Sequence, residues 1–366
     1  MIGRRRIEAL RRKGDVDGLI RALQREKPEE RAEAARSLAT AGDMRAVAAL
    51  VAMLLADEST LCRHDAACAL AVMMARGSAE LRDACGRALS QEPSVYSALS
   101  ICVGHEFTRA AQHLGSSLTM REAAVALAAT QSIEAVYSLV DGCCGGENVE
   151  YAFEVAADAL RSTSGNAYEV LIAAIRARPK PLDNLGSPSV DLVRAGHMLG
   201  KMGDPRTADD LISVLEEYRS YDESVRGLVG AAIGLGVLRD PKAVPALRAI
   251  VFASTSDAVR QEAARALATI GSPAADVLCE IARREKNKAV RQHAFDALLE
   301  LREPASLPTI LDAGRSYWEK PYLVRLLAEW GEPAAPGLAA IRDDDKQDPK
   351  VRRLAEEVLA AMVTSG

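Results

Sequence analysis

The feature that most constrains this chain is an internal repeat, whose start is marked by the same short signature five times in the second half. In each copy a proline follows an acidic or small polar residue and precedes an apolar stretch with helical spacing. The prolines are separated by 36, 32, 31 and 29 residues, and they are Pro205, Pro241, Pro273, Pro304 and Pro333. A period of about 30–36 residues with two helical patterns in each period is typical of an α-solenoid.

Each repeat is predicted to contain a first helix, a polar turn and a second helix. The proline fits the first position of the first helix, where its missing N–H is not needed and its fixed φ favours a helix start. The residue before it is Asp, Ser or Glu, which complements the positive end of the helix dipole. The second helix opens on Val-Arg after an Asp or Asn that can cap it, in Val225-Arg226, Val259-Arg260, Val290-Arg291 and Val351-Arg352.

The composition agrees with closely packed helices rather than with one large core. The chain is 49% hydrophobic but only 4% aromatic, and 66 of its 366 residues are alanine. Alanine favours helices and lets neighbouring helices approach closely. The first half follows the same plan with weaker punctuation. We therefore predict an all-α, right-handed α-α superhelix of about eleven helical pairs, with residues 1–366 forming a single array.

One proline-rich segment interrupts the array at residues 176–189. It contains Pro179, Pro181 and Pro188 and lengthens the local repeat spacing. This segment is a candidate hinge that would divide residues 1–175 from residues 190–366. The alternative is an ordinary surface loop.

The repeated residues resemble a known family. The pattern "VR…AA.AL..IG.P.AV.AL" is similar to HEAT repeats, specifically to the short HEAT-like units first associated with phycobilisome lyases. The resemblance implies an ARM-like superhelix. It does not fix a function, because such repeats occur in scaffolds, lyases, hydroxylases and transport factors.

An enzymatic function is the first alternative that the resemblance raises. Deoxyhypusine hydroxylase, a HEAT-like enzyme, holds two irons with four His-Glu pairs, whereas this chain offers only His105-Glu106 and the related His64-Asp65. The adjacent Cys143 and Cys144 have no second pair nearby, and phosphate-binding motifs are missing from the sequence. We therefore predict no catalytic residue, no metal ligand and no cofactor, and we identify no small-molecule substrate. A bilin lyase or a hydroxylase-related, metal-dependent modifying enzyme remains the alternative function.

The Val-Arg arginines have two interpretations. In HEAT arrays an Asp or Asn in the turn and an Arg on the second helix pair between neighbouring repeats, which is a structural role that Arg226, Arg260, Arg291 and Arg352 fit. The functional interpretation places Arg226, Arg260 and Arg291 in a line of cations on the concave face, where they bind an acidic partner. Both interpretations can hold together.

The N-terminus carries a basic cluster formed by Arg4, Arg5, Arg6, Arg11, Arg12 and Lys13. It could contact nucleic acid, anionic lipid or an acidic protein, although it has no interleaved aromatics for base stacking. The alternative is a solvated capping helix. The total charge of -5 argues against nucleic-acid binding by the chain as a whole.

Aromatic residues gather near the C-terminus. Tyr317, Trp318, Tyr322 and Trp330 lie within 20 residues, and aromatic side chains are common anchors of interfaces. Trp330 occupies a core position of its repeat. Tyr317 and Trp318 fall in a turn, and we predict that this pair binds a partner.

These observations favour a non-enzymatic scaffold that presents a curved helical surface to another protein. Nucleic acid bound through the basic N-terminus is a further and less favoured prediction. No segment approaches 18 apolar residues, so no membrane-spanning helix is expected. Seven cysteines, an odd number placed mostly in apolar helical runs, suit reduced thiols in the cytoplasm.

Overall fold

The structure is a computed structural model of the 366-residue chain. The residues that it describes are 2–78, 80–81, 84–85, 87, 124–125, 127–128, 133–143, 149–162, 166–176, 191–218, 225–314 and 319–365. All regular elements among them are helices. No helix in these ranges is both long and apolar enough to cross a lipid bilayer.

The chain divides into two compact units. Unit 1 comprises residues 1–174 and 181–202, and unit 2 comprises residues 175–180 and 203–366. Of the candidate hinge at 176–189, all residues except Arg176 lie outside the described part. The hinge therefore stays a prediction.

The helices follow one another in the order that the repeats predict. In and around unit 1 they are α1 (Ile2–Lys13), α2 (Val16–Ala22), α3 (Pro28–Ala41), α4 (Met44–Ala56), α5 (Thr60–Arg76), α10 (Ile133–Gly142), α11 (Val149–Ser162), α12 (Ala167–Arg176) and α13 (Leu192–Met202). In unit 2 they are α14 (Thr207–Tyr218), α15 (Val225–Leu238), α16 (Val244–Ala253), α17 (Asp257–Ile270), α18 (Ala275–Arg284), α19 (Lys288–Leu301), α20 (Leu307–Ala313), α21 (Lys320–Ala328), α22 (Ala335–Asp343) and α23 (Pro349–Ser365). Short 3₁₀ turns precede three first helices: η2 (Pro241–Ala243), η3 (Ser272–Ala274) and η4 (Pro304–Ser306).

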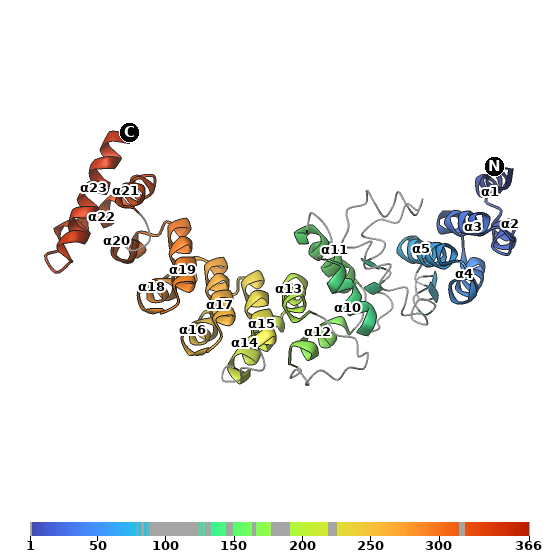
Figure 1. The fold of residues 1–366 in the computed structure, drawn as a ribbon, viewed down its shortest axis with the longest axis horizontal. Coiled ribbons are helices and arrows are strands. Elements are labelled where there is room, and N and C mark those ends of the chain that lie inside the picture. The colour runs from blue at the N-terminus through green and yellow to red at the C-terminus, as the bar shows by residue number, and fades with distance from the viewer. Residues whose placement is uncertain are drawn as a thin grey trace. The chain divides into compact units, whose positions relative to one another are not determined.

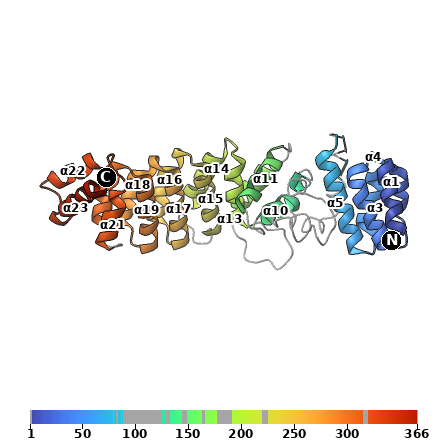
Figure 2. The same cartoon turned by 90° about the horizontal axis from the view of Figure 1, so that it is seen from above.

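Within unit 2 the paired helices form two layers. The first helices α14, α16 and α18 lie in one layer, and the second helices α15, α17 and α19 lie in the other (Figure 1). Figure 2 shows the same helices side by side along the array. Consecutive second helices pack closely because small residues face each other: a Cβ added to Gly236 of α15 would lie 3.0 Å from the Cα of Ala266 in α17.

The layer between the helices is the core, and it is filled mainly by Ala, Leu, Val and Ile. The side chains of Ala263, Ala264 and Leu267 in α17 are completely buried. Trp330 is buried, as its position in the repeat predicts. Among the described cysteines, Cys62, Cys68, Cys85, Cys143 and Cys279 are free and buried. Small side chains thus replace the large aromatic core of an ordinary globular domain.

The end of each second helix has a common backbone conformation. The residue two positions before each repeat proline has a positive φ, and these residues are Gly203, Arg239, Gly271, Arg302 and Gly331. A residue with positive φ stops the helix and turns the chain toward the next proline. Arg302 adopts the left-handed helical region (φ 52°, ψ 33°), whereas Gly271 has φ 86° and ψ -139°, a region open essentially to glycine alone.

The helix starts agree with the predicted caps only in part. Asn287 caps α19, because its side chain accepts hydrogen bonds from the N–H groups of Ala289 (2.8 Å) and Val290 (3.3 Å). Asp257 does not cap α17: it is the first residue of that helix, and its carboxylate binds Arg260. Pro241 and Pro304 open 3₁₀ turns rather than α-helices, so the first helices begin three residues later than predicted.

A buried ion pair joins two second helices in unit 1. Nη1 of Arg36 in α3 lies 2.6 Å from Oδ2 of Asp65 in α5, and the Asp65 side chain is fully buried. Burial raises the pKa of Asp65 to about 7, against the opposing effect of Arg36. Glu33, which also pairs with Arg36 at 2.8 Å, adds to the increase in pKa.

We expect the Gly271→Ala variant to lower the free energy of unfolding by about 1–3 kcal/mol, because alanine is strained at this φ and ψ. The matched control is Arg239→Ala, which keeps an ordinary residue at an equivalent position. Its effect should stay within about 0.5 kcal/mol. Urea denaturation followed by circular dichroism measures both. Equal losses in the two variants would contradict the conformational explanation.

We expect Asp65 to make stability fall as pH rises from about 4 to about 7. Its pKa is about 7 in the folded chain and 3.8 in the reference state, so only the folded chain retains the proton in this range. The variant Asp65→Asn should lose this dependence, which amounts to at most about 1.4 kcal/mol for each pH unit. Urea denaturation of both proteins at pH 5, 6, 7 and 8 tests this. Parallel pH profiles would show that Asp65 does not titrate there.

Candidate functional site

An arginine occupies the fourth residue of five second helices in the described part of the chain. These arginines are Arg31 of α3, Arg63 of α5, Arg260 of α17, Arg291 of α19 and Arg352 of α23. They include residues of the predicted Val-Arg series, together with two from the first half of the chain that lack the preceding valine. We call this set the arginine ladder.

Each of the first four ladder arginines reaches back to its own turn. Nη1 donates to the carbonyl oxygen of the residue six positions earlier, at 2.9 Å for Arg31, 2.7 Å for Arg63, 3.3 Å for Arg260 and 2.6 Å for Arg291. In three of these repeats the accepting residue is the C-cap of the first helix: Asp57, Ser254 or Glu285. The guanidinium therefore places a positive charge and a donor at a helix end whose carbonyls lack partners within the helix.

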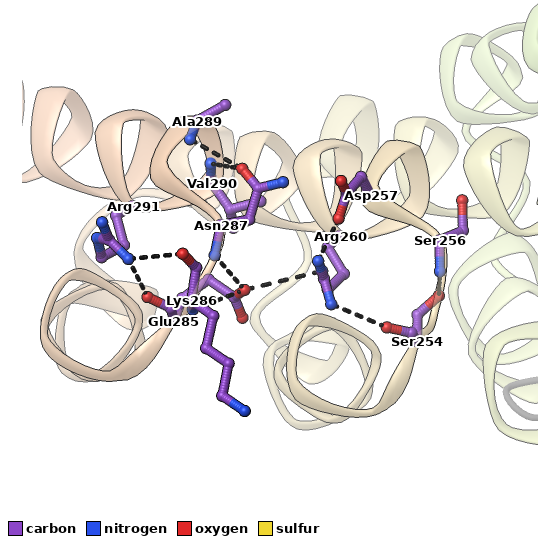
Figure 3. Close-up of polar contacts among 10 residues, drawn as sticks. All are labelled: Ser254, Ser256, Asp257, Arg260, Glu285, Lys286, Asn287, Ala289, Val290 and Arg291. Atoms are coloured by element: carbon purple, nitrogen blue, oxygen red, sulfur yellow. Dashed lines mark hydrogen bonds and ion pairs between the residues drawn. The ribbon is translucent and has the colours of Figure 1, made fainter.

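The same arginines also connect neighbouring repeats. Nε and Nη2 of Arg31 each lie 2.8 Å from a carboxylate oxygen of Asp57 in the following repeat. Nε of Arg260 lies 3.8 Å from Oε1 of Glu285, again in the following repeat (Figure 3). Asp57 and Glu285 are thus held through their side chains by the preceding repeat and through their carbonyls by their own.

Burial strengthens these contacts. The side chains of Asp57 and Glu285 are 7% and 5% exposed. Hydrogen bonds from Arg31 hold the pKa of Asp57 below its ordinary value. Glu285 also accepts from the N–H groups of Lys286 (2.9 Å) and Asn287 (3.0 Å), so one carboxylate fixes the whole turn shown in Figure 3. Charge-assisted hydrogen bonds of this kind are the stronger ones in proteins.

Arg226 does not belong to the ladder, although it shares the Val-Arg dipeptide. It is the second residue of α15, and Leu228 stands at the fourth position and is buried. The side chain of Arg226 is exposed, and residues 219–224 before the helix lie outside the described part. The dipeptide therefore does not make Arg226 equivalent to Arg260 and Arg291, and a partner contact by these three arginines stays a prediction.

The repeat prolines also define a row of side chains on the outer side of the second helices. Residues four, eight and twelve positions before each proline lie on one helix face, because this spacing follows the helical turn. We call them the outer row. They are Val229, Ile233 and Val237 in α15; Gln261, Arg265 and Thr269 in α17; and Gln292, Asp296 and Glu300 in α19. All nine are at least partly exposed.

The outer row changes character along unit 2. In α17, Arg265 is exposed and binds Glu262 at 2.7 Å, and in α19 the carboxylate of Asp296 accepts from Gln292 at 2.8 Å. In α15 the same positions hold three β-branched apolar side chains. The sequence analysis missed this feature because the glycines of "GAAIGLG" attracted attention to close packing. Counting back from Pro241 would have found it.

A cluster of titratable side chains lies on α11 and α13 of unit 1. Lys201 binds the carboxylate of Glu150, and Nε2 of His197 lies 3.4 Å from the same carboxylate. Burial lowers the pKa of His197, and Lys201 lowers the pKa of Glu150. The rings of His197 and Phe153 stack with centroids 4.4 Å apart. His197 is therefore a neutral side chain that packs between helices near pH 7.

The other predicted site residues divide into described and undescribed ones. In the basic cluster, Arg5, Arg6, Arg11, Arg12 and Lys13 are exposed on α1, and Arg4 lies in the same helix. Tyr317, Trp318, Cys144 and the pair His105-Glu106 lie outside the described residues, as does the side chain of His64. Within the described ranges, no group of three or more His, Cys, Asp and Glu side chains is arranged to hold a metal ion.

Comparison with known families identifies the repeats. Residues 212–299 and 249–319 match the model of HEAT repeats. These ranges include α15 to α20 and two rungs of the arginine ladder, at Arg260 and Arg291. The chain therefore contains HEAT repeats, and its described helices form an all-α helical-repeat fold. A comparison with curated proteins gave no match.

Solved structures with similar folds come from proteins of different function. Human deoxyhypusine hydroxylase in complex with glycerol is 20% identical, with 78% of this chain and 96% of that chain covered and a TM-score of 0.29. The complex of CpcE and CpcF of phycocyanin lyase from Nostoc is 16% identical, with coverages of 86% and 94% and a TM-score of 0.26. A chain from a structure of the interaction between cadherin and beta-catenin is 13% identical, with coverages of 98% and 97% and a TM-score of 0.30. The activities in these names are those of the other proteins.

We expect Arg291→Ala to lower the free energy of unfolding by about 1–3 kcal/mol, because two carbonyls at the end of α18 lose a charged donor. Arg226→Ala is the matched control, since Arg226 lies outside the ladder. Its effect should stay within about 0.5 kcal/mol. Thermal and urea denaturation measure the difference. If both variants lose the same stability, the ladder does not support the turns as described.

Proposed function

We propose that this protein is a non-enzymatic scaffold that binds another protein through the outer row of its second helices, with the apolar segment on α15 as the anchor. The observation that supports the proposal is the contrast between α15 and its neighbours. Val229, Ile233 and Val237 are partly exposed where α17 and α19 carry polar or charged residues. Apolar side chains bordered by polar ones are typical of a protein-binding surface.

The packing of α15 explains why this row is available for binding. Its glycines face neighbouring helices, so Gly236 brings α15 close to α17 and leaves the β-branched side chains on the outer side. β-branched side chains have few rotamers, and little side-chain entropy is lost when a partner covers them. Burying their remaining exposed area would contribute about 25 cal/mol for each Å².

The arginine ladder supports the same function indirectly. Arg260 and Arg291 bind turns and neighbouring repeats, so they hold α17 and α19 in place. A repeat array whose neighbours are fixed in this way presents its outer row in one arrangement, which lowers the ordering cost of binding. In this proposal the ladder maintains the surface, and the outer row makes the contacts.

The proposal predicts that Ile233→Gln combined with Val237→Gln abolishes binding of the partner without unfolding the protein. The partner is first identified by native purification and mass spectrometry, and its dissociation constant is then measured with both proteins purified. Loss of two apolar anchors should weaken binding at least about 30-fold, which corresponds to about 2 kcal/mol. Thermal denaturation checks that both variants remain folded.

The matched control is Arg265→Gln combined with Thr269→Gln, which changes the equivalent positions of α17. It should weaken binding less than fivefold. Equal losses in both double variants, or none in either, would contradict an apolar anchor on α15. A bound chromophore or stoichiometric iron in the natively purified protein would instead favour the bilin-lyase or hydroxylase-related alternative.

A further inference from the structure

The basic cluster forms one exposed helix in unit 1. α1 contains Arg5, Arg6, Arg11, Arg12 and Lys13, all of them exposed, with side chains of Arg11 and Arg12 that are 51% and 75% exposed. The acidic residue Glu8 lies 2.6 Å from Arg12 and 4.0 Å from Arg11. Six cations and one carboxylate give residues 1–13 a charge of +5, so the other residues carry -10 of the total of -5.

The cations of α1 stand in three directions around the helix axis. With about 100° for each residue, Arg5 and Arg12 share a central direction, Arg6 and Lys13 lie to one side, and Arg11 lies to the other. Together they cover roughly 220° of the circumference. The small side chain of Ala9 is exposed between the central pair, so the helix backbone can be approached closely there.

The opposite side of α1 is attached to the protein. Ile7 is fully buried, and α1 packs against α3 and α2. The helix is therefore folded before any ligand arrives, and binding pays no cost for forming it. Arg11, Arg12 and Lys13 also complement the negative C-terminal end of the helix.

We propose that α1 binds duplex DNA by lying in the major groove, separately from the protein-binding outer row of unit 2. The major groove is about 12 Å wide, and a helix with its side chains has a diameter of about 10–12 Å. In this position the central Arg5 and Arg12 face the floor of the groove. Arg11 on one side and Arg6 with Lys13 on the other face the two phosphate backbones.

The arrangement fits a two-walled anion better than the other polyanions. A membrane is flat, so cations spread over more than half of the helix cannot all reach it, and the apolar Ile7 that would enter lipid is buried. Single strands are held by stacking on aromatic side chains, and α1 contains none. An acidic protein surface would satisfy the charge but would have to enclose the helix from both sides.

The test measures binding of the full chain to a 20-base-pair DNA duplex of mixed sequence by fluorescence anisotropy. We expect a dissociation constant in the micromolar range at physiological salt, with affinity that falls steeply as NaCl increases. Combining Arg5→Gln, Arg12→Gln and Lys13→Gln should reduce the slope of log K against log salt by about 3 and weaken binding at least tenfold. Glu8→Gln should strengthen binding, because it removes the carboxylate from the basic face.

The matched control combines Lys242→Gln, Lys288→Gln and Lys346→Gln, which removes three exposed cations of unit 2. It should bind as the unchanged protein does. Circular dichroism confirms that all variants are folded. The proposal is overturned if the duplex does not bind, or if both triple variants lose the same affinity. Binding to poly-glutamate but not to the duplex would instead identify an acidic protein as the partner.

Discussion

The contact between a guanidinium group and the turn that precedes it is the interaction on which this repeat structure most depends. A solenoid has no central core, so each repeat is positioned only by its neighbours. Arg291 binds the carbonyls at the end of its own first helix, and Arg260 reaches the carboxylate of Glu285 in the same turn. One acidic residue is thus held from two repeats. The same arrangement recurs around Asp57 in unit 1, with Arg31 and Arg63. Its recurrence at both ends of the chain indicates a rule of construction rather than a local accident.

This construction separates the residues that maintain the fold from those available for recognition. Ladder arginines are engaged by carbonyls and carboxylates, and the seam between second helices is filled by small residues such as Gly236 and Ala266. What remains outward is the outer row, where side chains can change without altering the packing. An apolar segment on α15 and polar segments on α17 and α19 can therefore coexist on the same framework. The basic helix α1 is likewise held by Ile7 alone among its described side chains that are buried, which leaves its cations free of structural duties.

Local sequence signals predicted the elements well but the roles of single residues less well. The prolines marked where each first helix follows a second helix, since a fixed φ and a missing N–H are tolerated only at such a boundary. Asn287 was predicted as a cap and is one. Asp257 looked equivalent, but Arg260 in the next turn binds its carboxylate. Arg226 shares its dipeptide with Arg260 but stands two residues earlier in its helix. Short motifs fix neither the helix start nor the partner, because both depend on competing contacts from elsewhere in the chain.

By itself the sequence determined the class of fold: an all-α array of helical pairs with HEAT-like repeats, small residues between helices and a basic first helix. These properties follow from periodicity, proline placement and composition, which act over short distances along the chain. Only the tertiary structure decided which arginines form the ladder, that Asp65 is buried beside Arg36, and that the outer row of α15 is apolar. Those properties depend on which residues of neighbouring repeats meet. Repeats of 36, 32, 31 and 29 residues place equivalent sequence positions in different registers, so the meeting points cannot be counted from the dipeptides alone.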